Sequence, residues 1–405
     1  MNVLARLAVF ILLGPALLLA QTSTGQDTAG SKASDAKPAY AQTDSAGAQD
    51  STAPTDSHAG EMRAPQAAPT SEPAKPKAPL AYPVMSIKSK ERARQLYQYF
   101  VHGESAQLYA SFTPEMKKQS PESKINTIYK QVAEKLGTPG ETLSETFLPN
   151  LAAPITMYTH TTQYSKSKLP VMIILGVDGD GNLADFQVMP VQYPPRDEYS
   201  DYQDSTKLRL PFNGSWLVMQ GGRMLYDNAF VATDDNRYTV SFLYLKDGGL
   251  FDNEGRKNSD YYCFGQPVLA PAAGVVVQSA GNSSDHPPGR GPDIQSRGNY
   301  VVIAHGNSEF SLIPYLKAGS VKVRNGQRVK QGEVIGECGN SGSSPVPHVE
   351  YSLQNTRGFP LPKTMPAQFI DYTADGKPVT IGEPLRGQLV GNPPKSPSVE
   401  TAAKP

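Results

Sequence analysis

Four short runs rich in Val, Ile, Tyr and Phe follow one another between Gly298 and Gln354, and they constrain the fold more than any other feature of the chain. Clusters of Gly, Asn, Ser or Pro bound each run, and no stretch of helical periodicity interrupts them. Apolar runs of this length between turn-forming residues indicate consecutive β-strands. We therefore predict strands over residues 300–304, 309–316, 333–337 and 348–353.

Four sequence blocks in this stretch resemble, in order, the β-core of the lysostaphin/LytM-type zinc metallopeptidases, which cut peptide cross-links in bacterial cell walls. The blocks are GNYVVI, HGN, VKQGEVIG and a GNSG that leads into Pro347-His348. The preceding segment DYYCFGQPVLAPAAGVVV matches the strand, turn and strand that lead into this core. The resemblance implies an all-β domain of the duplicated-hybrid-motif, LytM-like type, an antiparallel sheet domain spanning residues 205–385.

Other residues stand at the positions that match the family's metal and catalytic centre. The family binds zinc through a His, an Asp and the second His of a His-x-His pair. The matching segments here are NAFV, RYTVSF and HVE, so Phe230, Ser241 and Glu350 replace the three ligands. Tyr315, in the segment IPYL, replaces a further catalytic His, and His348 is the residual family-matching position.

The replacements change the chemistry that the resemblance implies. A tetrahedral zinc site needs three protein ligands that carry lone pairs. Phe230 carries none, Ser241 is a poor neutral ligand, and Glu350 alone leaves the ion short of charge and coordination. His286 and His305 do not match the ligand set, and no nucleophile motif of the Ser-x-x-Lys or Gly-x-Ser-x-Gly type is present. We therefore expect no catalytic residue, no metal ligand and no cofactor.

The first twenty residues, MNVLARLAVFILLGPALLLA, predict a secretory signal peptide, with Arg6 before an apolar run that ends in the small Ala20. A membrane anchor is the alternative, but the run is shorter than the ~20 apolar residues of a spanning helix, and Pro15 interrupts it. We expect export to the periplasm or the extracellular space, with no stable membrane span after cleavage. The Ala/Pro/Ser/Thr-rich residues 21–85 predict a disordered tether, and residues 386–405 a disordered tail. Edge strands are a further expectation at residues 369–379 and 388–390.

Residues 86–193 predict a small α+β domain ahead of the β domain. Helical spacing of apolar residues predicts three helices within 88–136, and strands follow at 154–165, 169–176 and 183–191. The pattern faintly resembles the cone-shaped domains related to nuclear transport factor two. Asp178, Asp180 and Asn182 have calcium-loop spacing, but Met189 stands where such a loop has its bidentate Glu, so a hairpin turn is expected.

Cys263 and Cys338 are the two cysteines of the chain. The resemblance places both beside core strands in one region of the sheet, and exported proteins form disulfides in oxidising compartments. A disulfide between them is one expectation. Two buried thiols remain the other, because a sequence does not fix the distance between the two side chains.

Lys and Arg together number 38, as do Asp and Glu, so no basic surplus favours nucleic-acid binding. The hypothesis is a secreted, non-catalytic binding or regulatory module of the cell envelope. Its partners would be peptidoglycan stem peptides or a cell-wall hydrolase. The expected groove is lined by Phe230, Ser241, Tyr315, His348 and Glu350.

Two alternatives stay open. One is a divergent zinc metalloendopeptidase that hydrolyses peptidoglycan cross-links, in which case zinc would be the cofactor. The other is a structural scaffold in which Phe230 and Tyr315 fill the space of the missing ion.

Overall fold

The computed structural model of the chain describes strand residues 6–9 and residues 86–151, 153–233, 235–289, 296–357 and 362–393. None of the helices in these ranges has the length and apolar character needed to cross a membrane. The predicted tether and most of the predicted signal peptide lie outside the described residues.

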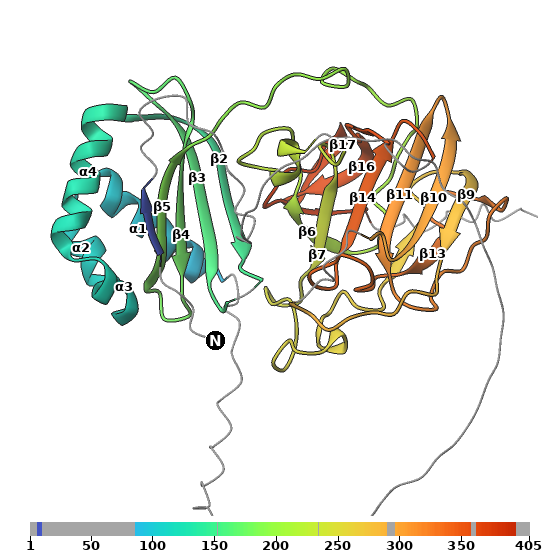
Figure 1. Ribbon diagram of the computed structural model, residues 1–405, viewed down its shortest axis with the longest axis horizontal. Helices are drawn as coiled ribbons and strands as arrows, with labels where there is room; N and C mark the ends of the chain where they lie inside the picture. The colour runs from blue at the N-terminus through green and yellow to red at the C-terminus, as the bar shows by residue number, and fades with distance from the viewer. Residues whose placement is uncertain are drawn as a thin grey trace, which may run out of the picture. The chain divides into compact units, whose positions relative to one another are not determined.

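The region that follows residue 85 is an α+β fold, as predicted, with helices on one face of an antiparallel sheet (Figure 1). Its helices are α1 (Ile87–Val101), α2 (Ser105–Ala110), α3 (Pro114–Gln119) and α4 (Glu122–Leu136). Helix α1 begins at Ser86, whose hydroxyl accepts a hydrogen bond from the Ser89 amide, and it buries Ala93, Leu96, Tyr97 and Phe100 along one face. Helix α3 was not predicted, because one and a half turns give too little periodicity.

The sheet of this region has the strand order β1-β5-β4-β3-β2. The strands are β1 (Arg6–Val9), β2 (Pro139–Pro149), β3 (Thr156–Tyr164), β4 (Val171–Val177) and β5 (Leu183–Pro190). Strand β1 lies within the predicted signal peptide and pairs parallel with β5, whereas the other pairs are antiparallel. Strand β2 was also missed, since the first half of this edge strand is exposed and lacks alternation of polar and apolar residues.

A hairpin turn joins β4 to β5 at the Asp- and Gly-rich segment. The Asp178 carboxylate accepts hydrogen bonds from the backbone amides of Asp180 and Asn182, at 3.0 and 2.8 Å. The Asp178 side chain is therefore used to close the turn, which agrees with the hairpin expected from the sequence.

The second region is the predicted all-β antiparallel domain. Its main sheet has the order β12-β9-β10-β11-β14-β7-β6-β18-β16-β17, and β15 pairs with β14. The strands are β6 (Ser215–Gln220), β7 (Val240–Tyr244), β9 (Gly274–Ala280), β10 (Asn299–Gly306), β11 (Glu309–Leu316), β12 (Arg328–Val329), β14 (Val349–Gln354), β15 (Thr364–Met365), β16 (Phe369–Ala374), β17 (Lys377–Gly382) and β18 (Leu389–Gly391). A two-stranded sheet of β8 (Pro267–Leu269) and β13 (Val334–Glu337) accompanies it.

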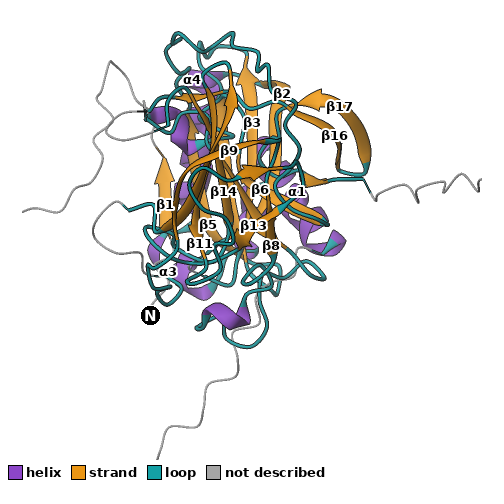
Figure 2. Ribbon diagram, turned by 90° about the vertical axis from the view of Figure 1, so that its right-hand side faces the viewer, coloured by secondary structure: helices purple, strands orange, loops and turns teal. Residues whose placement is uncertain are grey.

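The C-terminal boundary predicted for this domain is wrong. Strand β18 pairs with both β6 and β16, so residues 389–391 belong to the domain rather than to a disordered tail that begins at residue 386. A three-residue strand shows too little alternation for a boundary to be placed from it. The β16–β17 hairpin forms the far edge of the same sheet (Figure 2).

The core of the β domain is apolar and continuous. Trp216, 1% exposed, stacks on Phe212 with ring centres 4.7 Å apart. A disulfide joins Cys263 to Cys338 across 75 residues, with Cα atoms 6.0 Å apart. Constraining an unfolded loop of that length stabilises the folded chain by about 4 kcal/mol in the chain-entropy description.

Glu309, the first residue of β11, forms hydrogen bonds with the segment that leads into the β domain. Its fully buried carboxylate accepts hydrogen bonds from the Tyr202 hydroxyl (2.7 Å), the backbone amides of Ser205 (2.6 Å) and Thr206 (2.8 Å), and the Thr206 hydroxyl. Burial alone raises the pKa of Glu309, but these hydrogen bonds outweigh it and hold the pKa below the ordinary 4.5.

We predict that Glu309→Gln lowers the free energy of unfolding by about 2 kcal/mol at pH 7, because an amide cannot accept all of these hydrogen bonds. The pKa of Glu309 is lowered by folding. Its contribution is therefore complete above the unfolded-state pKa and is lost as the pH falls through the folded-state value. Urea unfolding between pH 7 and pH 3 measures both effects.

The matched control is Glu198→Gln, since Glu198 is exposed and makes a single surface ion pair with Lys363. The control should change stability by no more than about 0.5 kcal/mol. Equal losses in the two variants would contradict the anchoring role of Glu309.

Candidate functional site

Strand β14 separates the hydrophobic core from an open cleft of about 300 Å³. Successive side chains of a strand point to opposite faces of the sheet. One set belongs to the apolar core: Val349, Tyr351 and Leu353. The alternate set lines the cleft: Glu350, Ser352 and Gln354.

Strand β7 places Ser241 directly opposite Glu350. Side chains of directly opposed residues lie on the same face of a sheet, so the serine hydroxyl and the carboxylate share the cleft side of this strand pair. Ser241 is fully buried, and its hydroxyl has no hydrogen-bond partner among the described residues. The two positions that replace family ligands therefore lie next to each other.

His348 lies beneath Glu350 and is 3% exposed. Its Nδ1 lies 2.9 Å from the Val346 carbonyl oxygen and 3.0 Å from the Ser344 hydroxyl, which itself donates to that carbonyl at 2.7 Å. This arrangement favours the tautomer in which Nδ1–H donates to Val346 and Nε2 keeps its lone pair. His348 Nε2 is 3.7 Å from Glu350 Oε2, which is too long for a direct hydrogen bond.

Tyr315 closes one side of the cleft. The residue has a positive φ of 63°, in a part of β11 where the pairing with β10 shifts register. Its ring centre lies 5.5 Å from that of His348. Burial, and then the Glu350 carboxylate, raise the pKa of Tyr315 above its ordinary value, so the side chain stays a neutral phenol at physiological pH.

Phe230 belongs to the short 3₁₀ helix η1 (Ala229–Ala232) and also lines the cleft. Asn228 precedes this helix and is fully buried. Its side-chain oxygen accepts from the Phe230 amide at 3.0 Å, and its side-chain nitrogen donates to the carbonyls of Gly222, Arg237 and Thr239. Asn228 therefore holds the segment that carries Phe230 against the segment that leads into β7.

The structure brings all five residues of the predicted groove into one place. Phe230, Tyr315 and Glu350 line the cleft, while Ser241 and His348 lie buried beside Glu350. The sequence analysis did not identify the other charged groups that line the cleft, Asp235 and Arg297. Both lie outside regular strands, in segments without a chemical motif.

The donor set does not fit a zinc ion. Zinc needs three ligands with lone pairs, and the side chains grouped at Glu350 offer one carboxylate, one imidazole nitrogen and one neutral hydroxyl. Phe230, at the position that matches the first ligand, contributes no lone pair. Among the described residues, no cluster of three His, Cys, Asp or Glu side chains is arranged to hold a metal ion.

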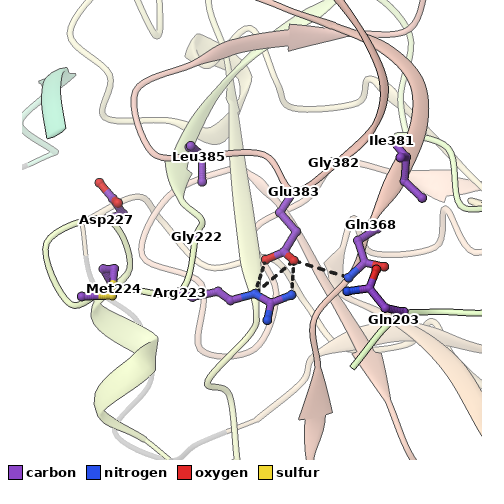
Figure 3. A pocket seen from close by; sticks show the side chains of 10 residues that line it. All are labelled: Gln203, Gly222, Arg223, Met224, Asp227, Gln368, Ile381, Gly382, Glu383 and Leu385. Carbon is purple, nitrogen blue, oxygen red and sulfur yellow. Dashed lines mark hydrogen bonds and ion pairs between the residues drawn. The ribbon is translucent and has the colours of Figure 1, made fainter. Parts of the chain in front are cut away.

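A second pocket, of about 480 Å³, lies between the turn after β6 and the segment after β17 (Figure 3). Arg223 Nε donates to Glu383 Oε2 at 2.9 Å, and Arg223 Nη1 donates to the Ser200 carbonyl. The two charged side chains satisfy each other, so their polar atoms are largely engaged. The cleft beside β14 is the stronger candidate site.

Part of the β domain is similar to known proteins. Residues 257–361 match the family described as Peptidase family M23. Peptidoglycan DD-endopeptidase ShyA of Vibrio cholerae serotype O1 is 38% identical over 97 residues, which cover 24% of this chain and 19% of that protein. Peptidoglycan DD-endopeptidase ShyC of the same organism is 32% identical over 117 residues, covering 27% of this chain and 24% of that protein. The match thus spans less than a quarter of either relative's length.

Among solved structures, the M23 metalloprotease pseudoalterin, from the deep sea, is 15% identical, with a TM-score of 0.28, and covers 45% of this chain and 100% of its own. The catalytic domain of the prophage-encoded M23 protein EnpA from Enterococcus faecalis is 18% identical, with a TM-score of 0.26, and covers 39% of this chain and 94% of its own.

We predict that Asn228→Ala lowers the free energy of unfolding by about 2–3 kcal/mol, because buried carbonyl groups lose their donor. Chemical denaturation measures the loss. Asn236→Ala is the control, since Asn236 is exposed at the same cleft, and it should change stability by less than about 0.5 kcal/mol. A stability loss in Asn228→Ala no larger than in the control would show that Asn228 does not hold the site together.

Proposed function

Residues 257–361 form a peptidase family M23 domain, and we propose that its cleft holds cell-wall peptides without hydrolysing them. The protein would act in the cell envelope as a binding or regulatory module, exported by its first twenty residues to the periplasm or the extracellular space. Its partners would be peptidoglycan stem peptides or a cell-wall hydrolase.

One observation carries the proposal, namely the identity of the side chains at the three ligand positions. In this family hydrolysis depends on a water activated by zinc. Phe230 has no lone pair, Ser241 is neutral, and Glu350 supplies a single carboxylate beside the His348 imidazole. Three separate segments have changed together while the strands around them remain, which favours a redirected site over a catalytic one.

The retained cleft supports binding. It combines the aromatic rings of Phe230 and Tyr315 with Glu350 and Arg297 at the surface of a rigid sheet. Pockets that hold ligands usually pair apolar walls with a few placed polar groups. The relatives ShyA and ShyC bear the name peptidoglycan DD-endopeptidase, which makes peptides of the wall the first ligands to test.

We predict that the purified full-length protein, incubated with excess zinc and then desalted, retains well below one zinc per chain. The triple variant F230H/S241D/E350H should retain about one, because it restores three lone-pair ligands and two of the positions are already opposite each other in the sheet. Metal analysis by mass spectrometry measures the content, and E350H alone serves as the control.

Stoichiometric zinc in the unaltered protein, together with chelator-sensitive hydrolysis of peptidoglycan cross-links, would replace the binding proposal with a divergent metalloendopeptidase. If neither protein retains zinc, the triple substitution does not rebuild the family's zinc site. That result would contradict the claim that the three replaced side chains are what prevents zinc binding.

We further predict that stem peptides bind the unaltered protein and bind a Tyr315→Ala/Glu350→Ala variant at least tenfold more weakly, a difference of about 1.4 kcal/mol. Calorimetric titration measures the affinities, and circular dichroism checks that the variant is folded. Leu385→Ala is the control, because Leu385 is exposed and lines the other pocket. Unchanged affinity in the double variant, or no binding to the unaltered protein, would favour a structural scaffold.

A further inference from the structure

We propose that the polar floor of this cleft, meaning Glu350 in its lining and Ser241 and His348 buried beside Glu350, recognises a primary ammonium group, carried by a lysine-like side chain of the bound peptide. The inference rests on the proposed function, since it names the ligand chemistry of the same cleft. The recognising atoms are the Ser241 hydroxyl, the Glu350 carboxylate and His348 Nε2.

Each of these three groups can accept a hydrogen bond, and none accepts one from another residue in the described part of the chain. The Ser241 hydroxyl is buried without a partner among the described residues. The Glu350 carboxylate has His348 Nε2 at 3.7 Å as its nearest ion-pair partner, and that contact is an ion pair only when the imidazole is protonated. In the tautomer fixed by the Val346 carbonyl, Nε2 presents a lone pair.

An ammonium group matches this set in number and in charge. It carries three N–H donors and no acceptor, so each acceptor of the floor receives one hydrogen bond. The bond to Glu350 would be charge-assisted, and the carboxylate is largely withdrawn from water, with 13% of its side chain exposed. A negatively charged ligand would instead meet the Glu350 carboxylate without compensation.

The aromatic walls favour the same ligand. Phe230 and Tyr315 line the same cleft as Glu350, and Tyr315 stays uncharged because its pKa is raised. Aromatic faces attract cations and pack against the methylene groups of a lysine-like side chain. The other charged residues of the lining are Asp235 and Arg297, so acidic groups outnumber basic ones in the cleft.

Calorimetric titration of the full-length protein tests the ammonium directly. The probe is the capped tripeptide Ala-Lys-Ala, and its partner is the same peptide with an acetylated lysine amine. We expect the acetylated peptide to bind at least about tenfold more weakly, because acetylation removes the charge and two of the three donors. Equal affinities would overturn the inference.

Two matched variants locate the effect. Glu350→Gln keeps the shape of the side chain and removes its charge, so the preference for the free amine should disappear. Asp235→Asn removes the same charge from an exposed position of the cleft, and the preference should remain. Loss of the preference in Asp235→Asn but not in Glu350→Gln would assign the recognition to the rim and overturn the proposal.

A spectroscopic measurement separates this inference from the proposed function. In protein labelled with ¹⁵N in the histidine rings, n-butylammonium chloride should shift the Nε2 resonance of His348, whereas n-butanol should not. Such a shift without stem-peptide binding would leave the ammonium site standing and remove the peptide-binding role. If stem peptides bind equally well with and without acetylation of the amine, and n-butylammonium causes no shift, the peptide-binding role stands and the ammonium site is overturned. If one equivalent of zinc shifts the Nε2 resonance and n-butylammonium does not, the residues form a metal site and the ammonium site is also overturned.

Discussion

The pairing of β14 with its two neighbours is the constraint on which the β domain and its cleft depend. The strand is hydrogen-bonded to β11 on one side and to β7 on the other. Because side chains alternate, one register commits Val349, Tyr351 and Leu353 to the core and Glu350 to the cleft. A shift of β14 by one residue would bury the Glu350 carboxylate in the core and expose Val349, Tyr351 and Leu353. Burial of these apolar side chains on one face of the sheet therefore fixes the position of Glu350 on the other face.

This dependence explains how the fold of the domain is held independently of the side chains that line the cleft. The core around Trp216 and Phe212 is apolar, and the Cys263–Cys338 disulfide constrains it further. Neither the apolar core nor the disulfide contains a residue that lines the cleft. Phe230, Ser241 and Glu350 therefore set the chemistry at the cleft, while the packing of the core depends on other residues.

The cleft region contains a strained backbone position at Tyr315 and a buried polar group at Ser241. Tyr315 occupies a strained backbone position beside His348, and strain of that kind costs about 1–3 kcal/mol and persists where surrounding structure enforces it. The buried Ser241 hydroxyl has no hydrogen-bond partner within the described ranges of the chain, which is also unfavourable in a native protein. Strain at Tyr315 and an unpaired hydroxyl at Ser241 are the features of this site on which the binding proposal depends.

The sequence by itself determined the antiparallel β domain, the α+β region before it and the residues that stand at the family's ligand positions. Runs of β-branched and aromatic residues between turns are local signals, and sequence blocks in a fixed order survive large changes elsewhere. Helix α3 and strand β2 escaped prediction because short or half-exposed elements carry little periodicity and form only when a neighbouring strand or core supports them. Tertiary structure alone decided that Ser241 lies opposite Glu350, that Cys263 meets Cys338, and that His348 Nε2 faces the carboxylate. Those relations join residues that are distant in the chain or depend on side-chain direction, and only the register of paired strands and the packing of the core determine them.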